Sequence, residues 1–207
     1  MAQIDYGAVA KTIAGNGWTA AATTGTMVPS IATTGNIFTM RAYTASTMAA
    51  LVNRIRVQYT TITAFGTPVT AGRRLALYRF AQPAGASNGN PSANNTNIVP
   101  IGLNPADTSS IFTQASATPN FGSMDIATTD VMTVGSNMTV AATPLRVLNL
   151  THAGAAGGNA EADWVFTVPV FLPAGYGLVI RPGANFEATG TWHLNLSIDW
   201  TEVGTST

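Results

Sequence analysis

The sequence has no cysteine and only two histidines, and charged side chains make up 9% of its 207 residues. Without cysteine, neither a disulfide framework nor a thiolate metal site can form. An ordinary soluble domain has about a quarter charged residues, so this chain is poor in the groups that catalysis uses most. We therefore expect a protein that is not an enzyme, with no cofactor and no metal.

Long apolar runs are also missing. No stretch approaches the roughly 18 apolar residues of a membrane-spanning helix, so no membrane partner is expected. The first ten residues lack a basic segment followed by an apolar one, and export by a signal peptide is not expected either. The apolar fraction of 46% is nevertheless enough to build a full core in one domain.

The few charges are separated along the chain although they sum to zero. Residues 1–106 contain seven cationic side chains and one acid, whereas residues 107–207 contain two cationic side chains and eight acids. One interpretation is that strands from the two halves interleave, so that the charges cancel locally. The other is that copies of the chain meet through oppositely charged surfaces, which would orient their association.

Alternation of apolar and polar residues predicts β-strands. It is clearest near the C-terminus, where one face carries Trp192, Leu194, Leu196, Ile198 and Trp200. Segment Leu51–Ala64 alternates in the same way, and one of its faces carries Leu51, Asn53, Ile55, Val57, Tyr59 and Thr61. Segment Gly72–Gln82 resumes the β pattern after a break at Gly66, and we expect it to pair with Leu51–Ala64 as a neighbouring strand.

Other segments have weaker strand patterns, and no long segment has the 3.6-residue period of a helix. The weaker strand candidates are 36–44, 98–103, 111–113, 125–134, 138–142, 145–150 and 164–172. Pro169 argues that the last of these is an edge strand or contains a bulge. Residues 83–97 and 151–163 are rich in Gly, Ala and Asn and predict long surface loops.

These patterns together predict an all-β fold. Residues 1–35 are expected to form an N-terminal arm or a weak first strand. Residues 36–207 are expected to form a single antiparallel β-sandwich domain of jelly-roll-like type, because many short strands are separated by turn signals.

Arginines form the one basic cluster of the sequence, and they are the candidate interface residues. They are Arg54, Arg56, Arg73, Arg74 and Arg79. Tyr78 and Phe80 lie nearby, but a nucleic-acid reader normally has a strongly basic surface, and this chain has no net positive charge. We expect these arginines to pair with acids of the second half or of a neighbouring copy, and we expect no direct contact with nucleic acid.

The acids and histidines show no motif for a metal or an active site. His152 and His193 have no second histidine at ligand spacing. Glu161 and Asp163 lie near His152 and could hold a divalent cation only if the loop folded back. Solvated loop charges are the simpler interpretation.

Two stretches of the chain contain recognisable strand-and-turn motifs. The first is NRIRVQYTTITAFGTPVTAGRRLALYRFAQ, residues Asn53–Gln82. The second runs from Leu145 to Val203 and ends in a GLVIR segment, a short turn and the strand TWHLNLSIDW. In both stretches the chain resembles bacteriophage virion proteins of unassigned or head-decoration type. The motifs are structural, and the resemblance implies no catalytic residues.

The resemblance implies a capsid decoration (cement) protein on the outer surface of the virion head. Such a protein binds at junctions between major capsid subunits and stabilises the shell. Its partners would be the major capsid protein and further copies of itself, in a trimer by analogy. A phage tail, neck or fibre protein is the alternative within the same class.

An alternative of another class is a carbohydrate-binding jelly-roll module. Such sandwiches bind sugars through exposed aromatic side chains. The four tryptophans Trp18, Trp164, Trp192 and Trp200 are available for this role. Two of them, however, fall on the apolar face of the C-terminal strand, so burial explains them better.

Overall fold

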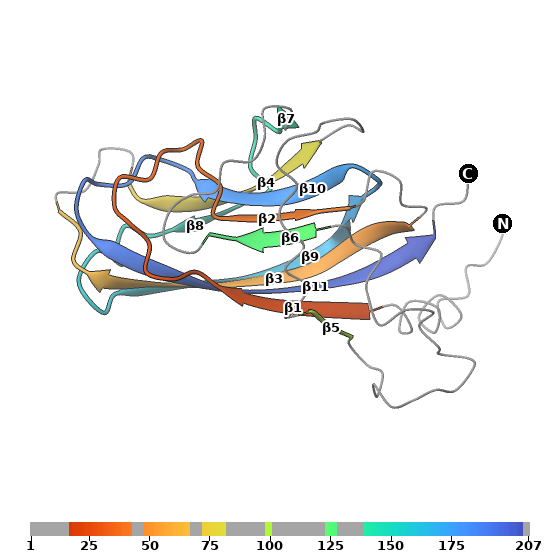
Figure 1. Ribbon diagram of the computed structural model, residues 1–207, viewed down its shortest axis with the longest axis horizontal. Helices are drawn as coiled ribbons and strands as arrows, with labels where there is room; N and C mark the ends of the chain where they lie inside the picture. The colour runs from red at the N-terminus through yellow and green to blue at the C-terminus, as the bar shows by residue number, and fades with distance from the viewer. Residues whose placement is uncertain are drawn as a thin grey trace.

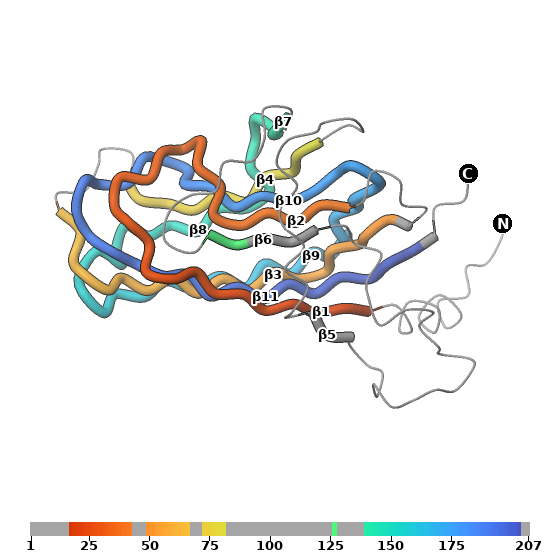
Figure 2. Tube along the Cα trace, in the orientation of Figure 1, coloured from red at the N-terminus to blue at the C-terminus, as the bar shows by residue number. Residues whose placement is uncertain are grey.

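The protein is an all-β sandwich of two antiparallel sheets (Figure 1). The computed structural model describes residues 17–42, 48–66, 72–81, 98–100, 123–127 and 139–204, and Figure 2 follows the chain through them. Within these ranges the chain forms strands, turns and bends but no helix. The predicted all-β sandwich is therefore confirmed.

The five-stranded sheet has the strand order β5-β1-β11-β3-β9. β11 pairs with β3 on one side and with β1 on the other. β3 also pairs with β9, which forms an edge of the sheet. The strands are β1 (Gly17–Thr23), β3 (Met48–Thr63), β5 (Ile98–Pro100), β9 (Asn159–Leu172) and β11 (Thr191–Gly204).

The six-stranded sheet has the strand order β6-β2-β10-β4-β7, and β8 also pairs with β4. β10 lies at its centre, and the consecutive residues Leu178, Val179 and Ile180 are all fully buried, so both faces of β10 are covered. The strands are β2 (Phe38–Arg41), β4 (Arg74–Ala81), β6 (Ser123–Ile126), β7 (Thr139–Val140), β8 (Arg146–Asn149) and β10 (Tyr176–Pro182).

From β1 to β6 and from β8 to β11, successive strands alternate between the two sheets, whereas β6, β7 and β8 all belong to the six-stranded sheet. β1, β3, β9 and β11 belong to the five-stranded sheet, whereas β2, β4, β8 and β10 belong to the six-stranded sheet. The prediction that Leu51–Ala64 and Gly72–Gln82 pair as neighbours is therefore wrong, because these segments form β3 and β4. Because β3 and β4 lie in opposite sheets, the apolar face of each strand packs against the other sheet. Two neighbouring strands of one sheet would instead turn their apolar faces to the same side.

The core lies between the two sheets and is built from one face of each strand. The predicted apolar face of β11, which runs from Trp192 to Trp200, is at most 4% exposed. Tyr59 on the neighbouring β3 stacks on Trp192 with ring centroids 5.4 Å apart. Phe38 and Leu77 from the six-stranded sheet belong to the same buried cluster.

The alternation along β3 changes face at Asn53. Ile55 is buried as predicted, but Val52 is buried in place of Leu51. The register of β3 shifts between Val52 and Arg54 against both of its neighbours, so that Asn53 has no register partner in either strand, although its Nδ2 donates to Thr201 Oγ1 of β11. Opposite β11, the extra residue on β3 forms a β-bulge and reverses the faces before it, so the prediction that Leu51 and Asn53 share a face with Ile55 is wrong.

Element boundaries follow the predictions only in part. β9 begins at Asn159, inside the predicted loop 151–163, and its second half is an irregular edge at Pro169, as predicted. β1 supplies the weak first strand expected within 1–35. Residues 1–16, the loop 83–97 and the segment 111–113 lie outside the described residues.

Two adjacent residues of β11 test the assignment of its faces. Ile198 is 1% exposed and faces the core, whereas Ser197 faces outward. We expect Ile198→Ala to lower the free energy of unfolding by about 2–5 kcal/mol, because it removes buried methyl groups and leaves a cavity. We expect Ser197→Ala to change it by less than about 0.5 kcal/mol. Equal losses in denaturant unfolding would contradict this arrangement.

Candidate functional site

The outer face of the five-stranded sheet carries a continuous layer of polar side chains. On β3, Arg54 and Arg56 point outward because the intervening Ile55 faces the core. The same pleat turns polar side chains outward on β9, β11 and β1. The outer polar face consists of Thr19, Thr23, Arg54, Arg56, Gln58, Glu161, Asp163, Asn195, Ser197 and Asp199.

One row of hydrogen bonds crosses all four strands of this face. Gln58 Nε2 donates to Glu161 Oε1 at 2.8 Å, and Asn195 Nδ2 donates to Gln58 Oε1 at 3.2 Å. Thr23 Oγ1 completes the row by donating to Asn195 Oδ1 at 2.7 Å. Because these residues lie directly opposite one another in the strand register, the row fixes the orientation of both amides.

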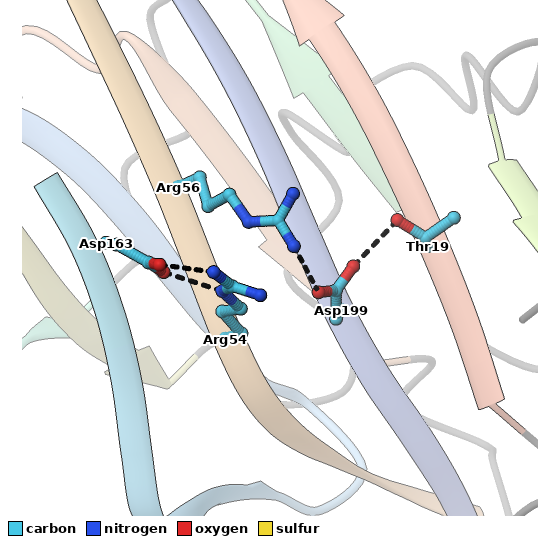
Figure 3. Close-up of polar contacts among 5 residues, drawn as sticks. All are labelled: Thr19, Arg54, Arg56, Asp163 and Asp199. Carbon is cyan, nitrogen blue, oxygen red and sulfur yellow. Dashed lines mark hydrogen bonds and ion pairs between the residues drawn. The ribbon is translucent and has the colours of Figure 1, made fainter. Parts of the chain in front are cut away.

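Two ion pairs run diagonally beside this row (Figure 3). Arg54 binds both carboxylate oxygens of Asp163, through Nε at 2.6 Å and through Nη2. Arg56 Nη2 lies 3.8 Å from Asp199 Oδ2, and Asp199 Oδ1 accepts a hydrogen bond from Thr19 at 2.8 Å. In the register Arg56 lies opposite Asp163 and Arg54 lies opposite Asp199, so each arginine pairs with the acid that faces the other.

The two pairs differ in strength. Hydrogen bonds from Arg54 hold the pKa of Asp163 below its ordinary value, and the same contact raises the pKa of Arg54. The separation of 3.8 Å between Arg56 and Asp199 exceeds a hydrogen bond, and the Arg56 side chain is 53% exposed. Arg56 is therefore the more available of the two guanidinium groups.

A shallow hollow of about 450 Å³ opens between these side chains. The short side chain of Ser197 leaves room between its longer neighbours. No aromatic residue belongs to the described lining, which consists of Arg56, Val57, Gln58, Glu161, Ala162, Asp163, Asn195, Leu196 and Ser197. The hollow can hold a polar or charged group of a partner, but it offers no stacking platform.

Arg73 lies inside the protein rather than on an interface. Its Nη1 donates to Glu187 Oε1 at 3.0 Å, and the two side chains are 2% and 4% exposed. The guanidinium also lies 4.2 Å from the ring centroid of Phe65. This pair ties the start of β4 to the segment between β10 and β11, and it closes one end of the core.

Arg74 and Arg79 lie on β4, in the sheet opposite Arg54 and Arg56. Arg74 Nε donates to the carbonyl oxygen of Gly183 at 3.0 Å, and Arg79 lies over the ring of Tyr176 at 4.6 Å. Of the five candidate arginines, the structure therefore brings only Arg54 and Arg56 together on one surface.

Each of the three ion pairs among the described residues joins a cation from the first half of the chain to an acid from the second half. They are Arg54–Asp163, Arg56–Asp199 and Arg73–Glu187. The interpretation that strands of the two halves interleave and cancel charge locally is confirmed for these residues. The separation of charge along the sequence reflects the pairing of β3 with β9 and β11.

Sequence reasoning missed the row formed by Glu161, Gln58, Asn195 and Thr23. The outward position of Asn195 followed from the alternation of its strand, but the strand order was needed to bring Gln58 beside it. Glu161 and Asp163 belong to a strand, and each contacts a side chain of β3. The described residues contain no group of three or more acids and histidines that could hold a metal ion.

All four tryptophans are buried, with exposed fractions between 0% and 7%. None of them can serve as a surface platform for a sugar ring. Across the described part of the chain, no helix is long and apolar enough to cross a membrane.

No protein-family model matches the chain, and no curated protein sequence matches it significantly.

The Arg54–Asp163 pair predicts a specific acid titration. We expect Arg54→Gln to raise the pKa of Asp163 toward its ordinary value of 3.8, because the two hydrogen bonds to the charged carboxylate are lost. The contribution of this depressed pKa to stability is present above pH 3.8 and disappears as the pH falls through the lower folded value. NMR titration of the Asp163 carboxyl carbon measures the shift, and Arg56→Gln is the matched control with a smaller effect. A pKa that stays low in Arg54→Gln would contradict the pairing.

The buried pair predicts a large loss of stability. Glu187→Gln keeps the shape of the side chain but leaves the Arg73 charge buried without compensation, and we expect a loss of about 3–5 kcal/mol in the free energy of unfolding. Asp163→Asn removes the acid of an exposed pair and should cost much less. Denaturant unfolding of both variants gives the comparison. If Glu187→Gln cost no more than Asp163→Asn, the buried pair would not stabilise this end of the core.

Proposed function

We propose that this chain is a bacteriophage capsid decoration protein, which binds the outer head shell at junctions between major capsid subunits and stabilises it. One observation carries the proposal: the outer polar face is built of side chains that bind one another across four strands. Such a face is rigid, nearly neutral and without a reactive group, so it suits contact with protein better than catalysis. The proposed role is structural, with no cofactor and no enzymatic activity.

The order of the strands gives further support. The neighbours β1-β11-β3-β9 in one sheet and β2-β10-β4-β8 in the other are joined by chain segments that cross between the sheets. This order supports a jelly-roll topology, and jelly rolls occur in viral capsid proteins. The argument is one of fold-level analogy and carries no residue-level role.

An apolar rim along β9 supplies a second contact surface. Val165, Val168 and Phe171 are 59%, 82% and 45% exposed on this edge strand. Val165 and Phe171 lie opposite Arg54 and Leu51 of β3, whereas Val168 lies in the irregular stretch from Phe166 to Pro169, which has no register partner on β3. Exposed apolar residues on an otherwise polar molecule favour burial against a neighbouring subunit.

Stabilisation of the shell would follow from mass action. A protein that binds only the assembled shell favours that state over separated subunits by the free energy of its binding. The major capsid protein would be the main partner, with further copies of this chain beside it on the virion surface.

The other hypotheses differ in what supports them. A tail, neck or fibre protein could use the same surfaces. A carbohydrate-binding module has the polar hollow in its favour, because the amides of Gln58 and Asn195 can bind sugar hydroxyls. The burial of all four tryptophans stands against it.

Particles that lack the protein test the proposal. We expect them to release their DNA at a lower temperature than complete particles, because the bound protein no longer favours the closed shell. Release is followed with a DNA-binding dye during heating, and adding the purified protein back should restore the original temperature. An unchanged release temperature would overturn the decoration role. An unchanged temperature together with lost adsorption to host cells would favour the tail alternative.

A further inference from the structure

The two sheets carry different charge on their outer surfaces. The outer polar face has three acids and two arginines, and Glu161 is the acid without a cationic partner among the described residues. On the six-stranded sheet, Arg74 and Arg181 have no acidic partner among the described side chains. Among the described side chains, the outer polar face therefore has one acid that no arginine binds, and the six-stranded sheet has two arginines that no acid binds.

The two unpaired arginines are held in place by neutral groups. Arg74 Nε donates to the Gly183 carbonyl at 3.0 Å, and Arg181 Nε donates to Asn36 Oδ1 at 2.6 Å. Arg74 is exposed and Arg181 is half-buried. Each is anchored through Nε, and a guanidinium has further N–H donors that a carboxylate of a partner could bind. We call the surface around them the arginine face; it consists of Arg74, Val147, Asn149 and Arg181 on β4, β8 and β10.

Each face also contains one exposed valine beside its charges. In the six-stranded sheet, Val147 and Arg181 both lie opposite Ala76 in the register, on either side of it, and Val147 is 47% exposed. In the five-stranded sheet, Val165 lies two residues beyond Asp163 on the same side of β9 and is 59% exposed. Each surface thus has an exposed apolar side chain near a charge that is not paired within the described residues, Glu161 on one and Arg74 and Arg181 on the other.

We propose that the outer polar face of one copy docks on the arginine face of a second copy of this chain. Glu161 and the neighbouring acids would meet Arg74 and Arg181, and the two valines would be buried in the contact. Charge complementarity favours this occupant, because it brings the acid that has no arginine partner on one face to the arginines that have no acidic partner on the other.

A contact between two different surfaces is heterologous, so it adds subunits in one direction. Repeated contacts of this kind close into a ring when the rotation from one copy to the next is a full turn divided by the number of copies. A ring of three copies is one such assembly. The inference rests on the proposed function in one respect, since it supplies the contact for the homo-oligomer expected of a decoration protein.

Charge reversal on both faces tests the contact. We expect Glu161→Arg and Arg74→Glu each to weaken self-association of the purified protein by about tenfold or more, because each brings like charges together. The variant with both Glu161→Arg and Arg74→Glu restores an opposite-charge pair with the two charges exchanged. Its self-association should recover to within about threefold of that of the original protein. Sedimentation at low and high salt measures association, which should weaken as salt increases.

The controls separate this contact from other effects. Ala156→Arg adds a cation in the exposed turn before β9 and should leave association unchanged. Circular dichroism checks that each variant is folded. A double variant as weak as the single ones, or an original protein that stays monomeric at low salt, would overturn the contact. No shell is present in this experiment, so its failure is distinct from a failure to stabilise the shell.

Discussion

The sandwich depends on the pairing of β11 with β3 and β1. β11 lies inside the five-stranded sheet, and its alternation sends five large apolar side chains into the core. The same alternation sends Asn195, Ser197 and Asp199 to the outer surface, where they meet side chains of β1 and β3. Core and candidate site are thus two faces of one strand. A shift of β11 by one residue would exchange them and destroy both.

The placement of the few charges explains how a chain with so little charge remains specific. Arg54 and Arg56 bind Asp163 and Asp199 on the surface. Exposed ion pairs of this kind add little to the free energy of unfolding, so their main effect is to orient the side chains of the outer polar face. Arg73 and Glu187 are buried at the end of the core, where loss of either partner leaves the other uncompensated. Arg74 and Arg181 bind only neutral groups among the described residues. Charged side chains therefore stabilise the end of the core at one position and order the outer polar face at a second, and we propose that they bind a second copy of the chain at a third.

The sequence predicted what depends on local alternation and failed where distant strands decide. The buried face of β11 and the all-β class followed from a period of two. The pairing of β3 with β4 was wrong, because periodicity shows which side of a strand is apolar and not which strand lies beside it. The bulge at Asn53 has no signal in the alternation, since one inserted residue only exchanges the faces. The arginines were recognised as a set, but the strand order divided them among two surfaces and the core.

We propose that this chain is a structural subunit whose outer faces bind other protein chains. A reconstruction of the virion at a resolution that shows individual strands tests this most directly. It should place the sandwich on the outside of the head at junctions between capsid subunits, with the five-stranded sheet of one copy against the six-stranded sheet of the next. Density for this chain only in the tail, or none at all on the particle, would contradict the account.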